Sequence, residues 1–177
     1  MAFTYLPYED RTPDGQYAAV LRRVMNEGEH VATQQEAGAR RVMGPQMNFD
    51  LRNGFPIVTE RDVVTPGEKT HTSIFTQALS ELAAFLNGAH TQAELERFGV
   101  PWWKPWVTPE KCAKRGLPPG DLGPGSYGPA FRAFPTLEGG HFDQITNILE
   151  QIRELPHLRT HFISPWIPQY IGRGKGK

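Results

Sequence analysis

The segment from Thr72 to Gly88 limits the fold most, because it predicts a helix that other parts of the chain must cover. Its apolar residues repeat at helical spacing: Ile74, Phe75, Ala78, Leu79, Leu82, Phe85 and Leu86. Gly88 is a typical residue at which such a helix ends. Glu81 lies three residues after Ala78 and four before Phe85, on the same apolar face. We therefore expect Glu81 to be shielded from bulk water.

A carboxylate on a buried face must lose its charge, find a donor or line a cleft. Desolvation would raise the pKa of Glu81 towards the range that is useful for proton transfer. The alternative is a structural acid that pairs with an arginine, and the spacing alone favours this second interpretation. Deciding between them needs other features of the sequence.

Length and charge exclude several classes of protein. The 177 residues predict one domain over 1–177, with residues 171–177 as a flexible end. Nineteen basic side chains balance nineteen acidic ones, so no global field attracts nucleic acid or an acidic membrane. No secretion signal and no apolar run of about 18 residues occur. The lone Cys112 rules out a disulfide framework and a multi-cysteine metal site. We expect a cytoplasmic protein without a metal.

Other segments predict further elements. Thr12 is the expected N-cap, and Pro13 the first residue, of a helix that ends at Gly28. Residues 45–59 alternate apolar and polar around Asn53-Gly54, which predicts strand, turn, strand. Thr91 and Glu94 predict a capping box. Residues 101–135 contain eight prolines and five glycines, which predicts an irregular loop. A helix is expected over 142–155 and a strand over 159–166.

Several segments, taken in order, resemble the thymidylate synthase family, whose members methylate C5 of deoxyuridylate with a folate. The segments are "GPQMNFDLRNGFPIVT", "ELAAFLNG", "WWKPW", "DLGPGSYGPAFRAFPT" and "DQITNILEQIRELPHLRTHFISPW", and the match runs from Val24 to Trp166. The resemblance implies an α/β fold with a thymidylate-synthase-like bent mixed sheet and helices packed on one face. It also implies a homodimer formed through the other face.

The resemblance implies roles for individual residues. They are Glu81 as general acid/base, Tyr127 beside the nucleophile, Trp103 and Trp106 against the folate, Arg61 near the folate tail and Arg159 on the substrate phosphate. The implied co-substrate is 5,10-methylenetetrahydrofolate and the implied substrate is a pyrimidine deoxynucleotide. Without the resemblance, a tryptophan-rich loop is more often plain core packing.

Some positions depart from the family pattern. Gln34 and Thr160 stand where the family has phosphate-binding arginines, and glutamine lacks the charge and the bidentate fork of arginine. Arg40 and Arg41 either compensate or are solvent-facing charges. Ala84 replaces a tryptophan beside Glu81, which would reshape the pocket. The base that is modified, and a methyl or hydroxymethyl product, therefore stay open.

The family's nucleophilic cysteine follows the "SPW" segment at a distance and is not among these residues. Cys112 lies far from that position, and we expect it to be a bystander thiol. The resemblance thus implies an N-terminal portion of a longer enzyme. The alternatives are a non-catalytic paralogue that acts by binding or dimerisation, a dUMP or dCMP hydroxymethylase, and, on three basic residues alone, a tail that binds RNA.

Overall fold

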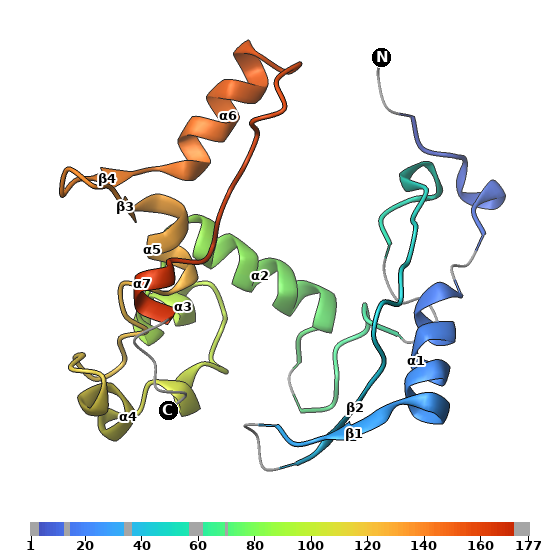
Figure 1. Ribbon diagram of the computed structural model, residues 1–177, viewed down its shortest axis with the longest axis horizontal. Coiled ribbons are helices and arrows are strands. Elements are labelled where there is room, and N and C mark those ends of the chain that lie inside the picture. The colour runs from blue at the N-terminus through green and yellow to red at the C-terminus, as the bar shows by residue number, and fades with distance from the viewer. Residues whose placement is uncertain (1–3, 13–14, 34–36, 57–61, 70, 172–177) are drawn as a thin grey trace. The chain divides into compact units, whose positions relative to one another are not determined.

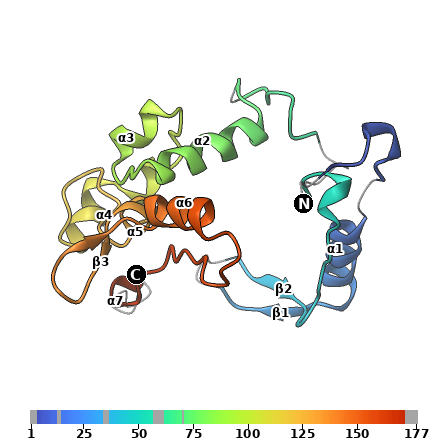
Figure 2. The ribbon, with the colours of Figure 1, turned by 90° about the horizontal axis from the view of Figure 1, so that it is seen from above.

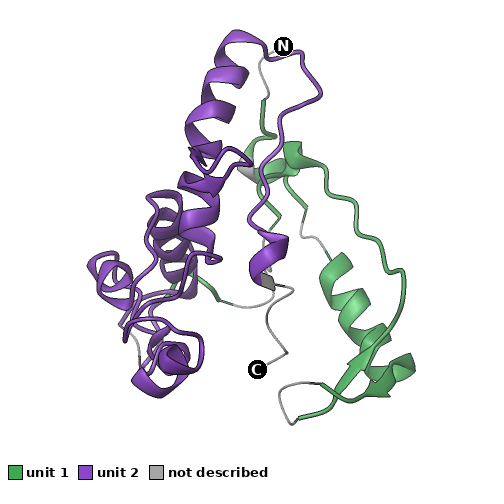
Figure 3. Cartoon of the chain, turned by 60° about the vertical axis from the view of Figure 1, so that its left-hand side comes forward, with its two compact units in different colours: residues 1–65 green, residues 66–177 purple. Residues whose placement is uncertain are grey.

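The computed structural model describes residues 4–12, 15–33, 37–56, 62–69 and 71–171 (Figure 1). The chain divides into two compact units, residues 1–65 and 66–177 (Figure 3). The expectation of one domain over the whole chain stays a prediction, and most of the expected flexible end, residues 172–177, lies outside the described residues.

The first unit is built on one helix and one hairpin. α1 (Gln16–Glu27) precedes the antiparallel strands β1 (Glu29–Val31) and β2 (Ala39–Arg41), and the 3-10 turns η1 (Tyr8–Asp10) and η2 (Leu51–Asn53) complete the unit. The predicted end at Gly28 is confirmed, but the predicted cap at Thr12 is wrong because Gly15 caps α1. Thr12 instead donates its backbone N–H to Asn53 Oδ1 at 2.8 Å.

The predicted strands around Asn53-Gly54 do not form within residues 45–56. The turn itself exists, because Asp50 accepts from the Arg52 N–H and Gly54 adopts a φ of 105°. Phe49 and Leu51 are 39% and 51% exposed, so the alternating side chains have no covering layer in this unit. A strand without a partner ladder or a buried face is not stable by itself. Residues 57–59 lie outside the described part of the chain.

The second unit holds all the buried hydrophobic residues of the described chain. α2 (Ile74–Leu86) contacts α3 (Gln92–Arg97) and α5 (Tyr127–Arg132), and α5 also contacts α6 (Gln144–Glu154) (Figures 1 and 2). The core consists of Ala84, Phe85, Ala89, Leu95, Val100, Val107, Cys112 and Leu122. The helix expected from Thr72 begins at Ile74, with Ser73 as its N-cap. Its predicted end is confirmed, because Gly88 follows the C-cap Asn87 with a φ of 86°.

The predicted capping box of α3 is confirmed. Glu94 N–H donates to Thr91 Oγ1, while Glu94 Oε2 accepts from the backbone N–H groups of His90 and Thr91. The N–H of His90 lowers the pKa of Glu94 below its usual value, against a desolvation that raises it.

We expect the stabilisation from Glu94 to be present above the ordinary glutamate range and lost as pH falls through the lowered pKa. The contribution is of order 1 kcal/mol or less, because the Glu94 side chain is 35% exposed. Urea unfolding at several pH values between about 6 and 3 measures it. Glu94→Gln should reduce the pH dependence, and an unchanged slope would contradict this assignment.

The prediction of little regular structure in residues 101–135 is wrong. This segment contains η3 (Lys104–Trp106), α4 (Pro109–Lys114) and α5. Pro109 occupies the first turn of α4, where its missing N–H costs nothing, and Thr108 accepts from the Lys111 N–H. Pro109, one of the prolines from which an irregular loop was expected, therefore lies at the start of a helix.

The expected mixed sheet is not seen in the described residues, which form mixed helices with two small sheets. These sheets are β1–β2 and the antiparallel pair β3 (Phe134–Pro135) and β4 (His141–Phe142). The helix expected from residue 142 begins at Gln144, after the Asp143 cap, and ends at Glu154. The expected strand over 159–166 has no strand partner and leads to the short helix α7 (Pro168–Ile171).

Gln144 holds that unpaired segment in place. Its buried amide donates to Ala130 O at 2.6 Å and Ser164 O at 2.8 Å, and accepts from Ser164 N–H at 2.9 Å. Two of these three hydrogen bonds pair the backbone C=O and N–H of Ser164, so Ser164 needs no neighbouring strand for these two groups.

We expect Gln144→Met to lower the free energy of unfolding by about 2–4 kcal/mol, because it leaves buried backbone groups without partners. Urea denaturation with circular dichroism measures the change. Glu150→Met, on an exposed position of the same helix, should change stability by less than about 0.5 kcal/mol. Equal effects of the two substitutions would contradict the role of the Gln144 amide.

Candidate active site

The site is built around Glu81, which is half-buried on α2. Its Oε1 accepts two indole hydrogen bonds, from Trp102 Nε1 at 3.1 Å and from Trp103 Nε1 at 2.5 Å. The expected alternative of an arginine partner is not seen among the described ion pairs, none of which includes Glu81. Neutral N–H donors therefore hold the acid and leave its charge without a counter-ion in the described chain.

The chain after α3 brings the two tryptophans to the helix. Val100 is fully buried, and its N–H bonds to Leu95 O, which anchors the residue before Pro101 and Trp102 in the core. Trp102 and Trp103 then pack on the same core as α2. The local sequence thus delivers two donors to one face of one helix.

Three aromatic rings form a wall beside the acid. Phe85, Trp103 and Tyr127 meet edge to face, with centroids 5.6, 5.2 and 6.5 Å apart for the pairs Phe85–Trp103, Phe85–Tyr127 and Trp103–Tyr127. Tyr127 also meets Trp166 at 5.9 Å. Of these rings, Trp103 also contacts the carboxylate directly, through its indole N–H. The structure therefore brings Glu81, Trp103 and Tyr127 together.

Comparison with known protein families shows to which family the chain belongs. The thymidylate synthase family matches residues 15–175. The chain belongs to the thymidylate synthase family. The match spans nearly the whole sequence and includes every residue of the Glu81 site. The resemblance stated for Val24 to Trp166 is thus confirmed. Thymidylate synthases are enzymes that act on deoxyuridylate with methylenetetrahydrofolate.

Two other residues implied by the family pattern, Trp106 and Arg159, are exposed. Trp106 is 58% exposed, and Lys111 Nζ lies 5.1 Å from its ring centroid. Arg159 is exposed on the segment after α6. Arg61 and Gln34 lie outside the described residues.

Three further positions have defined surroundings. Arg40 donates to Met25 O at 2.7 Å, and Arg41 pairs with Glu29 at 4.0 Å. Ala84, expected to reshape a pocket beside Glu81, is fully buried in the core.

Sequence reasoning missed Trp102 as a partner of Glu81. The family pattern directs attention to Trp103 and Trp106, whereas the structure pairs Glu81 with the two consecutive tryptophans. The only signal in the sequence is the Trp102-Trp103 doublet, which periodicity does not interpret.

Cys112 is a buried structural thiol of this thymidylate synthase family member. Its exposed fraction is 0%, and its Sγ donates to Asp121 O at 3.4 Å. A thiol enclosed in the core cannot reach a substrate. This placement agrees with the expected bystander role.

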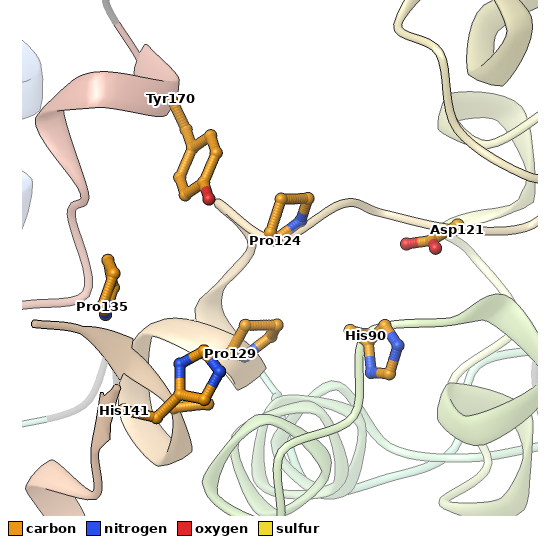
Figure 4. A pocket seen from close by; sticks show the side chains of 8 residues that line it. His90, Asp121, Pro124, Pro129, Pro135, His141 and Tyr170 are labelled. Atoms are coloured by element: carbon orange, nitrogen blue, oxygen red, sulfur yellow. The ribbon is translucent and has the colours of Figure 1, made fainter. Parts of the chain in front are cut away.

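A shallow pocket of about 260 Å³ lies elsewhere in the second unit (Figure 4). It is lined by His90, Asp121, Pro124, Pro129, Ala133, Pro135, His141 and Tyr170. None of the described residues predicted for the site lines it, so it is separate from the Glu81 cluster.

The described residues contain no group of three or more His, Cys, Asp or Glu side chains placed to hold a metal ion. Within the same residues, every helix is too short or too polar to span a bilayer.

Proposed function

We propose that the protein transfers a one-carbon unit from 5,10-methylenetetrahydrofolate to C5 of a pyrimidine deoxynucleotide, as in the methylation of dUMP to dTMP. The observation that carries this proposal is a carboxylate held by indole N–H groups beside Trp103 and Tyr127. A carboxylate that transfers protons to and from a pyrimidine needs a fixed position that is partly shielded from water. The family assignment supports the same reaction.

In this proposal Glu81 takes and returns protons at the pyrimidine or at a water molecule bound to it. Tyr127 and Trp103 keep bulk water from one side of the carboxylate, and Arg159 supplies an exposed positive charge for the phosphate. Cys112 is buried, so the thiol that attacks C6 has to come from outside these 177 residues.

The exposed indole of Trp106 fits a flat heterocycle, because an aromatic ring with a free surface gains from stacking. Trp106 and Arg61 are the residues that we propose hold the folate, together with Trp103. When bound, methylenetetrahydrofolate would supply the one-carbon unit and, for a methyl product, the hydride that reduces it, leaving as dihydrofolate. We further propose a homodimer and a cytoplasmic location, the latter because the lone thiol fits a reducing compartment.

The test uses the protein purified from its native source. Incubation with dUMP and methylenetetrahydrofolate labelled in the one-carbon unit should give labelled nucleotide, and mass spectrometry should identify a methyl product. A hydroxymethyl product, or labelling of dCMP instead, would reassign the product or the substrate within the same chemistry. No labelled nucleotide from either dUMP or dCMP would refute the proposal.

A second candidate is a non-catalytic family member that acts by binding or dimerisation. The burial of Cys112 and the presence of Thr160 at an arginine position favour it. The intact mass of the native protein separates the two candidates. A mass near 19.9 kDa favours the binding protein, and a clearly larger mass favours the enzyme.

A further inference from the structure

Both indole donors of the site reach the same oxygen of Glu81. Trp102 Nε1 and Trp103 Nε1 donate to Oε1, and the described residues provide no hydrogen bond to Oε2. An indole N–H can only donate, so Oε1 has to act as an acceptor in this arrangement. The two oxygens of the carboxylate are therefore chemically different before any substrate binds.

Two converging donors also fix the direction of the carboxylate. Trp103 has helical backbone angles, and the turn at Trp102 and Trp103 lets neighbouring side chains point to one atom, which an extended strand would not allow. Hydrogen bonds to a carboxylate are charge-assisted, and a pair of them restrains both its distance and its plane. Trp102 and Trp103 also pack on the core, which restrains the donors themselves.

We propose that Trp102 is a positioning residue that, with Trp103, reserves Oε1 as acceptor and so assigns proton transfer to Oε2 of Glu81. A proton on Oε1 would compete with two N–H donors for its lone pairs, whereas Oε2 is free to bind and release it. The inference rests on the proposed one-carbon transfer for its catalytic part and on hydrogen-bond geometry for the rest.

The kinetic test compares two replacements of Trp102 in the active protein. Trp102→Phe removes the N–H and part of the ring, whereas a benzothiophene analogue at position 102 keeps the ring size and removes only the N–H. Both should lower kcat about tenfold, the order expected for one lost hydrogen bond to a charged group, with KM changed less than about twofold. An analogue with wild-type kcat would show that packing alone matters and would overturn the proposal.

The structural test does not depend on activity. In protein labelled with ¹⁵N-tryptophan, Glu81→Gln should shift the indole N–H signals of Trp102 and Trp103 together, while those of Trp106 and Trp166 stay in place. A shift of the Trp103 signal alone would overturn the two-donor arrangement. Wild-type protein without transfer activity would refute the proposed function, and with it the catalytic part of this inference, while the indole signals would still decide the geometry.

Discussion

Replacing Glu81 with glutamine should lower kcat for one-carbon transfer by about 10²- to 10⁴-fold, the range that general acid–base catalysis contributes. Glutamine keeps an oxygen that accepts from Trp102 and Trp103, so the shape of the site and its donors are preserved. The amide nitrogen that replaces Oε2 cannot take up a proton at neutral pH. The loss should therefore fall on kcat rather than on stability.

Steady-state kinetics with dUMP and methylenetetrahydrofolate measure this loss, and thermal unfolding shows that the variant is folded. Glu138→Gln, an exposed carboxylate between β3 and β4, is the matched control and should keep wild-type kcat. A Glu81→Gln variant within about threefold of wild type would leave Glu81 as a structural acid, the alternative that the sequence alone favours.

The largest expected effect on stability is that of Gly128→Ala in α5. A Cβ at Gly128 would overlap the carbonyl oxygen of Ala89 and lie 2.6 Å from the carbonyl carbon of Gly88. Both atoms are backbone, in the connection between α2 and α3, and cannot rotate away. We expect a loss of about 3 kcal/mol or more, at the upper end of the cost of overpacking.

Denaturant unfolding of Gly128→Ala and Gly140→Ala tests this prediction. An added Cβ at Gly140 meets only Thr136 Oγ1, at 3.4 Å, so that substitution should be nearly neutral. Gly128 follows Tyr127 directly, so its substitution should also disturb the contact of Tyr127 with Phe85, visible in near-ultraviolet circular dichroism. Similar stability of the two variants would show that Gly128 does not lie in close contact with the backbone of Gly88 and Ala89.

Local signals in the sequence predict helices better than they predict sheets here. The ends at Gly28 and Gly88 and the Thr91–Glu94 capping box depend on neighbouring residues, and the structure has all of them. The start of α1 differs because Thr12 bonds to Asn53, far along the chain. The strands expected around Asn53 and over 159–166 need partners that periodicity cannot supply.

The candidate site was also predictable only in part from the sequence. Helical spacing predicts a buried face around Glu81, but Ile74 and Ala78 on that face are exposed and only Phe85 is buried. The contact of Glu81 with Trp103, which packs on Tyr127, agrees with the family resemblance. The second donor was not predictable, because the orientation of Trp102 depends on the turn that follows Val100. Trp106 looks equivalent in sequence, yet it is exposed and faces Lys111.

The amide of Gln144 joins α5, α6 and the segment around Ser164 without any formal charge. An ion pair at the same place would weaken with added salt and with protonation of its acid. A neutral amide responds to neither. The contribution of the Gln144 amide therefore persists under changes of ionic strength and acidity that weaken the neighbouring ion pair of Arg132 and Asp143.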